Sequence, residues 1–453
     1  MDLVVRSKRV VLGDGVRPAS VHVRGGVIER VDAFDAVPPG VPVDDAGELV
    51  VLPGLVDTHV HVNEPGRTEW EGFATATRAA AAGGVTTIVD MPLNASPPTT
   101  SRAAFEAKSA ATGGKIFVDV GLTGGVVPGN SGQLRELARA GCLAFKCFLV
   151  DSGVPDFGHV GEDELRTAMP ILADEGAPLL VHAELAGPID AALRRQGTVP
   201  DAELTRYVHW LESRPREAEN EAVDLVVRLV HATGARAHVV HLSSADAVSA
   251  IRLARDAGVP LSAETCPHYL VFAAEDVPDG ATEYKCAPPI RERHNRERLW
   301  QALADGVIAQ VVTDHSPSPS SLKCAESGDF QRAWGGIASL ELGLRATWTE
   351  ASARGMGIAQ LAEWMSAAPA RLVGLGRKGS IAPGKDADLV VWDPDGESVV
   401  EVAALHQRHK STPYARRTLS GVVHATYLRG RKVYAAGAHV GAPSGRLLRR
   451  GEA

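Results

Sequence analysis

The sequence has few cysteines, no excess of positive charge and no long hydrophobic run, and each of these absences excludes a class of protein. Its five cysteines are scattered and none forms a Cys-x-x-Cys pair, which argues against a disulfide framework and a structural zinc site. The formal net charge is −8, so neither nucleic acid nor an anionic membrane surface is an expected partner. No stretch approaches the roughly 18 apolar residues of a membrane span, and the charged N-terminus does not resemble a signal peptide. We therefore expect a cytoplasmic protein.

Apolar and polar residues alternate at both ends of the chain. Residues 2–34 follow this pattern around the turns LGDG and VRGG, and the same texture returns at 379–395 and 421–437. The pattern predicts short antiparallel strands. We expect the two flanks to pair into one small β-sandwich, which requires the chain between them to return to its starting point, as a closed barrel does.

The middle of the chain alternates short apolar runs with helix-like segments. Segments such as EWEGFATATRAAAAGG and SGQLRELARAG are rich in Ala, Leu and charge and end at Gly, as surface helices do. The eight apolar runs are 50–61, 85–91, 115–122, 142–150, 178–184, 237–243, 260–269 and 307–315. Strands that alternate with helices in this number predict a (β/α)8 TIM-type barrel. The expected domains are the barrel at 53–376 and the two parts of the sandwich at 1–52 and 377–453.

Two histidines lie one residue apart in the segment GLVDTHVHVNEPG, residues 54–66. Side chains alternate between the faces of a strand, so both imidazoles point the same way. A pair of hydrogen-bonded core histidines is one interpretation of such a motif. The residues at the other strand ends decide between this interpretation and a functional site, because the chemistry of such barrels lies at the C-terminal ends of the strands. The polar candidates at those ends are His59, His61, Lys146, His182, His241 and Asp314.

These six groups do not fit an ordinary barrel interior, which branched apolar side chains normally fill. Four imidazoles and a carboxylate exceed the three protein ligands of a single catalytic zinc ion, so two divalent ions are predicted, roughly 3.5–4 Å apart. Beside two cations the pKa of Lys146 should fall, and its neutral amine could take up carbon dioxide as a bridging carbamate. An ion pair between Lys146 and Asp119 or Glu184 is the alternative.

Asp314 opens the segment DHSP directly after an apolar run. A carboxylate in this place can ligate one ion and accept the proton of a bound water as general base. The alternative is a helix N-cap, but Pro317 and Pro319 disfavour a helix that begins immediately after Asp314.

Taken together, DTHVH, the lysine of the fourth run, the histidines of the fifth and sixth runs and TDH in the eighth resemble the amidohydrolase superfamily, in its cyclic amidohydrolase branch. That branch contains dihydroorotases, dihydropyrimidinases (hydantoinases) and allantoinases, and the resemblance covers essentially the whole chain. The segments most similar to the allantoinases are HVHVNEPGRTEWEGF, VDMPLNASPPTT, KCFLVDSGVPDF, ETCPHY, KCAPPIR and DHSPSP.

The resemblance implies an enzyme that hydrolyses the cyclic amide bond of allantoin to give allantoate, with a metal-bridged hydroxide as nucleophile, and that assembles as a homotetramer. Zinc is the expected metal, and cobalt, manganese, nickel and iron also accept such ligands. The implied roles are His59 and His61 on the more buried ion, His182 and His241 on the more exposed ion, carbamylated Lys146 as the bridge, and Asp314 as ligand and general base and acid.

Asn63 stands where dihydroorotases have an arginine that binds the substrate carboxylate in bidentate fashion. Its amide offers no charge, so an uncharged ring is the expected substrate. Asn94, Ser316 and the backbone at Cys286 and Ala287 are further substrate-binding candidates, with turn capping as the alternative for Asn94 and Ser316. Cys286 is not an expected nucleophile.

Two other functions stay open at this point. A hydantoinase or dihydropyrimidinase would have the same metal ligands, although it differs in the NEPGRTEWEG loop. A non-catalytic assembly protein of the same branch would have lost ligands, whereas all six positions are intact here. The remaining histidines of interest, which we expect to be structural rather than ligands, are His231, His238, His268 and His315.

Overall fold

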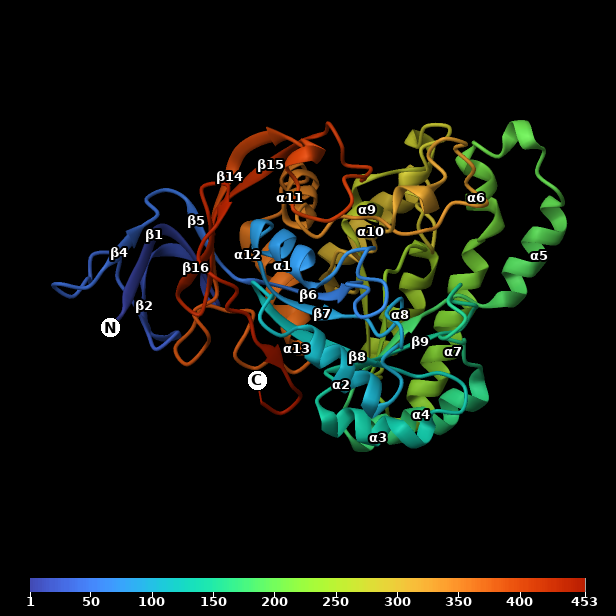
Figure 1. Cartoon of the computed structure of the whole chain (residues 1–453), viewed down its shortest axis with the longest axis horizontal. Coiled ribbons are helices and arrows are strands. Elements are labelled where there is room, and N and C mark those ends of the chain that lie inside the picture. The colour runs from blue at the N-terminus through green and yellow to red at the C-terminus, as the bar shows by residue number, and fades with distance from the viewer. Residues whose placement is uncertain (453) are drawn as a thin grey trace.

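The computed structural model describes residues 1–452, and its strands form two large sheets (Figure 1). The first sheet is a run of eight neighbouring parallel strands from the middle of the chain. The second combines strands from both ends of the chain, which lie side by side at one end of the molecule. The predicted fold class, a TIM-type barrel with a small β-sandwich domain formed by both termini, is confirmed in its barrel and in the joining of the termini, whose strands form one hydrogen-bonded sheet.

The eight strands of the first sheet follow one another in chain order, each parallel to the next. The sheet closes because Val60 pairs with His315 in a parallel bridge and the N–H of His61 donates to the carbonyl of His315 at 2.8 Å. The strands are β6 (Leu55–Val60), β7 (Val85–Asp90), β8 (Asp119–Gly125), β9 (Ala144–Phe148), β10 (Leu179–His182), β11 (Ala237–Val239), β12 (Leu261–Thr265) and β13 (Gln310–Val311).

Helices follow the barrel strands and cover the outside of the barrel (Figure 1). They pack there through one large apolar cluster to which Ile88 and Val181 contribute from strands and Ala80, Leu137 and Val226 from helices. The helices are α1 (Phe73–Ala82), α2 (Arg102–Ala111), α3 (Ser131–Ala140), α4 (Glu162–Asp174), α5 (Ala186–Gln196), α6 (Tyr207–Ser213), α7 (Arg216–Thr233), α8 (Val248–Asp256), α9 (Pro267–Val271), α10 (Arg293–Ala304), α11 (Gly343–Ala353), α12 (Ile358–Ala362) and α13 (Ala368–Leu372). The predicted surface helices around residues 69–84 and 131–141 are α1 and α3.

The second sheet is continuous in its hydrogen bonds, and β5 pairs with β1 on one side and β14 on the other, which joins the two ends of the chain. It has its own apolar cluster, which includes Val5, Val21, Leu389 and Tyr427. Its strands are β1 (Leu3–Leu12), β2 (Gly15–Arg24), β3 (Val27–Asp32), β4 (Val43–Asp45), β5 (Val50–Pro53), β14 (Leu389–Val399), β15 (Thr418–Leu428), β16 (Arg431–Ala435) and β17 (Ala438–His439).

The single apolar run predicted at 50–61 is two strands in the structure. It divides at Gly54, so that β5 belongs to the terminal sheet and β6 begins the barrel. A Cβ at Gly54 would lie 2.3 Å from the Thr86 hydroxyl oxygen and 2.9 Å from Cβ of Asp388, so only glycine fits where the chain crosses between the two sheets.

Buried charges join the two sheets. The ammonium group of Lys378 donates to Asp119 of β8 at 2.6 Å and to Asp388, which precedes β14, at 2.7 Å. A short strand, β18 (Leu447–Leu448), pairs with β8 as well. We propose that the domains divide near residues 52–53 and 376–377; Ala453, the last residue of the predicted C-terminal part, lies outside the described residues. Within residues 1–452, no helix is long and apolar enough to cross a membrane.

Candidate metal centre

Six polar side chains converge at the end of the barrel where the parallel strands finish. His59 lies in β6 and Lys146 in β9, His182 is the last residue of β10, and the others follow their strands within a few residues. All six are buried. The structure therefore brings together His59, His61, Lys146, His182, His241 and Asp314.

The first group of donors consists of His59, His61 and Asp314. Nε2 of His59 lies 3.3 Å from Oδ1 of Asp314, and Nε2 of His61 lies 3.5 Å from the same oxygen. One donor atom of each residue lies within 4.8 Å of the other two. Imidazole nitrogens with a carboxylate oxygen suit a borderline divalent ion such as zinc.

The second group is His182 with His241. The Nε2–H of His182 donates to Glu184 at 2.7 Å, which leaves the lone pair on Nδ1. This Nδ1 lies 3.0 Å from Nε2 of His241. The His241 ring is also next to the first group, with its centroid 5.4 Å from that of His59. Lone pairs from both groups are thus directed into one space.

Lys146 lies in the same space with a buried side-chain nitrogen that has no hydrogen-bond partner among residues 1–452. Its ammonium position is over the Phe148 ring, 5.1 Å from the centroid. Burial lowers the pKa of Lys146 to about 8, although Asp314 and Glu264 act in the opposite direction. Buried polar groups normally have a partner, and a lowered pKa favours the neutral amine. Both features fit an amine that reacts with carbon dioxide to form a carbamate.

The alternative ion pairs of Lys146 are wrong. Asp119 accepts from Lys378 at 2.6 Å and from Arg429. Glu184 accepts from His182, and from Arg214 through Nε at 3.0 Å and through a terminal nitrogen at 2.6 Å. Neither carboxylate is an acceptor for Lys146.

The charge states of the donors suit metal ligation. Burial lowers the pKa of His61 to about 4 and lowers the pKa of His182 and of His241, so these imidazoles are neutral at neutral pH. Burial alone would raise the pKa of Asp314, but the neighbouring His59 and His61 outweigh it and hold that pKa at about 2. Neutral imidazoles with an ionised carboxylate are the forms that bind a metal ion.

Glu264, at the end of β12, orients the first histidine. It accepts from Nδ1–H of His59 at 2.6 Å, from Nε2–H of His238 at 2.9 Å and from the Gln310 amide at 3.0 Å. Burial would raise the pKa of Glu264, but the bonds from His238 and His59 hold it well below its usual range. The bond to Nδ1 directs Nε2 of His59 toward Asp314. Sequence reasoning missed this role, because the sequence marks Glu264 only as an acidic residue within the apolar run predicted at 260–269 and does not reveal its partner.

We expect Glu264→Gln to raise the dissociation constant of the bound ions by about 10–100-fold, the usual cost of losing the partner that orients a histidine ligand. The amide removes the charge that stabilises the Nδ1–H of His59. Competition with a chelator measures the change. Asp388→Asn is the matched control, because Asp388 is also a buried, paired carboxylate but lies at the junction of the sheets. Equal metal affinities in wild type and Glu264→Gln would contradict the role.

The backbone at the centre is held in an unusual conformation. Asn63, Asn94, His241 and Asp314 have φ of 66°, 63°, 40° and 45°, in the left-handed region. Such residues cost about 1–3 kcal/mol each and persist where the surroundings fix them. One source of that fixation is Asp57, which accepts from the N–H groups of His59 and Thr313, both at 3.1 Å, and so ties the first barrel strand to the residue before Asp314.

A cavity of about 260 Å³ opens onto both donor groups. Of the residues predicted to bind substrate, Asn94, Cys286, Ala287 and Ser316 line it. Asn63 does not: its side chain is fully buried and its amide nitrogen donates to the carbonyl of Pro317 at 3.4 Å. Burial raises the pKa of Cys286 to about 12, so this thiol is protonated and a poor nucleophile, as expected.

Sequence reasoning missed the outer wall of the cavity. Trp210 donates from its indole N–H to the carbonyl of Cys286 at 3.0 Å and lies under the Lys285 ammonium, 4.1 Å away. Lys285 in turn donates to the carbonyl of Ala333 at 2.7 Å. Trp334 packs edge-on against Trp70 with centroids 5.2 Å apart. These contacts hold the loop at 333–336 over the cavity.

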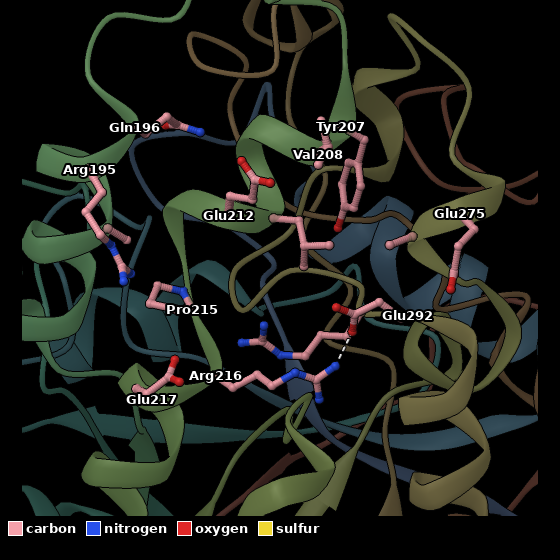
Figure 2. Close-up of a pocket in the computed structure, with 14 residues that line it drawn as sticks. Arg195, Gln196, Tyr207, Val208, Glu212, Pro215, Arg216, Glu217, Glu275 and Glu292 are labelled. Carbon is pink, nitrogen blue, oxygen red and sulfur yellow. Dashed lines mark hydrogen bonds and ion pairs between the residues drawn. The ribbon is translucent and has the colours of Figure 1, made fainter.

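A second cavity, of about 760 Å³, lies between α5, α6 and α7 (Figure 2). None of the six converging residues lines it. Arg216 pairs with Glu292 on its wall, as the dashed line in Figure 2 marks. This cavity is larger but has none of the grouped histidine, lysine and aspartate donors, so the chemistry lies at the barrel mouth.

The chain is similar to known proteins over most of its length. The model of a family described as "Amidohydrolase family" matches residues 50–433. An allantoinase from Streptomyces avermitilis is 51% identical to this chain over 451 residues, which cover 99% of each chain. The allantoinase of Arabidopsis thaliana is 41% identical, over 98% of this chain and 90% of its own length. The solved structure of an L-hydantoinase (dihydropyrimidinase) from Arthrobacter aurescens superposes with a TM-score of 0.94 at 31% identity, over 99% of this chain and 100% of that one.

Proposed function

Because this chain belongs to the amidohydrolase family, we propose that it is an allantoinase, which hydrolyses the cyclic amide bond in the five-membered ring of allantoin to give allantoate. The observation that carries the proposal is the convergence of two donor groups and an unpartnered lysine on one cavity of about 260 Å³. Full-length identity of 41–51% to allantoinases supports the choice of substrate within the family.

The protein binds divalent metal, as its family and its grouped donors indicate. We propose two ions, with His59, His61 and Asp314 on one and His182 and His241 on the other. Zinc is the proposed metal, and a carbamate formed from Lys146 and carbon dioxide would hold both ions. When bound, such ions polarise a carbonyl group and lower the pKa of water toward neutrality.

Asp314 is the residue that moves the proton in this proposal. It is ionised at neutral pH because His59 and His61 hold its pKa at about 2, so it can accept the proton of the attacking water. The ring nitrogen is a poor leaving group unless it is protonated. Asp314 delivers the proton to that nitrogen as the ring opens, acting first as general base and then as general acid.

The cavity wall suits an uncharged ring. Outside the metal centre its cationic side chains are Arg214 and Lys285. Arg214 is paired with Glu184 at 2.6 Å, and Lys285 donates to the carbonyl of Ala333 at 2.7 Å. Arg214 is therefore not free to pair with a substrate carboxylate, whereas the ammonium group of Lys285 is directed to the backbone carbonyls of the loop. Asn63, although it does not line the cavity, stands where the dihydroorotases have a carboxylate-binding arginine. Dihydroorotate is therefore an unfavourable substrate.

A hydantoinase or dihydropyrimidinase activity is the second candidate. The TM-score of 0.94 to an L-hydantoinase supports it, since the same cavity could admit other neutral cyclic ureides. The presence of all six ligand positions speaks against a non-catalytic assembly protein. Parallel assays of allantoin, hydantoin, dihydrouracil and dihydroorotate on metal-loaded enzyme test these functions. The proposal also includes a homotetramer, as the resemblance of the sequence implies, and a cytoplasmic location, which the few scattered cysteines favour.

A further inference from the structure

Cys266, His268 and Asp314 form a third group of donor atoms beside the metal centre. Cys266 and His268 lie at the end of β12 and the start of α9, and Asp314 follows β13. One donor atom of each residue lies within 4.8 Å of the other two, and all three residues are buried. Only Asp314 belongs to the donor groups described above.

No hydrogen bond of the described residues explains why the imidazole of His268 is buried. It is fully buried, and neither of its ring nitrogens has a hydrogen-bond partner within residues 1–452. The only ring contact found for it in that range is with its neighbour Tyr269, at 4.2 Å between centroids. Buried polar groups normally have partners, so an imidazole without one, next to a thiol and a carboxylate, indicates a place for a ligand.

The three donor types select a particular class of ion. Sulfur, nitrogen and oxygen donors together suit thiophilic divalent cations, whereas magnesium and calcium prefer oxygen alone. The six residues of the metal centre include no cysteine, so sulfur distinguishes this group from it. Asp314 lines the cavity, whereas Cys266 and His268 do not, so the group adjoins the cavity through Asp314.

We propose that Cys266, His268 and Asp314 are an additional, inhibitory site for a thiophilic divalent cation. On binding, the ion replaces the proton of the Cys266 thiol, which leaves to solvent through the cavity. An ion held here engages the carboxylate that moves the proton in hydrolysis, so turnover falls. The inhibitory part rests on the proposed function, whereas binding itself does not.

Titration of the metal-loaded enzyme with Cd²⁺ tests the proposal through two readouts. The first is the ultraviolet charge-transfer absorption of a Cd²⁺–thiolate bond, which exchange of Cd²⁺ into the histidine, lysine and aspartate centre cannot produce. The second is the rate of allantoin hydrolysis. In wild type we expect the absorption and the inhibition to develop together, at the same Cd²⁺ concentration.

Cys266→Ala should abolish the absorption and raise the half-inhibitory Cd²⁺ concentration roughly tenfold or more, by analogy with losses of metal partners elsewhere. Cys266→Ser and His268→Gln test the same group if the alanine variant folds poorly. Cys324→Ser is the control, because Cys324 is partly exposed and belongs to none of the donor groups, and it should retain both signals.

Unchanged absorption in Cys266→Ala would overturn the site, and thiolate absorption without inhibition would overturn its inhibitory role. If allantoin proves not to be the substrate, the absorption readout still decides whether the site binds the ion. Failure of the cation site and failure of the proposed allantoinase activity are therefore distinguishable.

Discussion

Asp314→Asn is expected to reduce the turnover of allantoin by about 10²–10⁴-fold, the range typical of losing acid–base catalysis. The amide can occupy the same place and offer an oxygen to a metal ion, but it cannot carry a proton. The backbone should tolerate the change, because Asp314 has φ of 45° and asparagine is among the residues that adopt this region most readily.

The design requires metal content to be measured on the same samples. We expect the asparagine variant to keep most of its metal while kcat collapses, which separates proton transfer from ligation. Asp388→Asn, at the junction of the sheets, controls for the general effect of neutralising a buried aspartate. A fully metallated Asp314→Asn enzyme with turnover close to wild type would exclude Asp314 as the proton carrier.

Lys146→Ala is expected to lose bound metal and activity together. The side chain is fully buried at the cavity that both donor groups line, so alanine leaves a space there and removes the proposed carbamate. Short-chain carboxylic acids should enter this space and partly restore both metal content and activity, since a carboxylate offers the same two oxygens. Metal analysis and allantoin assays with and without added acetate or propionate measure the effect.

Lys146→Met is the matched control for the rescue. Methionine is close to lysine in length and fills the space, so we expect this variant to be inactive and not to respond to added acids. Full metal occupancy of Lys146→Ala without any acid would contradict the bridging role of Lys146.

Much of the fold could be predicted because the barrel strands are short apolar runs between recognisable helices. The limits appear where the local pattern is ambiguous. The run at 50–61 has the pattern of one strand because both of its halves are apolar and buried. Its first half, β5, nevertheless pairs with β14 in the terminal sheet. The strand β18 has only two residues, Leu447 and Leu448, and depends on pairing with β8 rather than on any pattern of its own.

The candidate ligands could be identified because a polar residue at the end of an apolar strand stands out in the sequence. The residues that orient them could not, because their contacts join distant segments. Glu264 lies 205 positions from His59, and only closure of the barrel brings them together. The orientation of Asn63 was equally inaccessible: its left-handed backbone turns the amide toward Pro317 rather than into the cavity.

The most direct test of the central claim is a comparison of kcat/KM for allantoin, hydantoin, dihydrouracil and dihydroorotate, with metal content determined on the same preparation. We expect allantoin to exceed each of the others by at least about tenfold, because groups placed for the ureido-substituted ring are left unpaired by rings that lack it. A well-metallated enzyme that opens hydantoin or dihydrouracil much faster than allantoin would contradict the assignment.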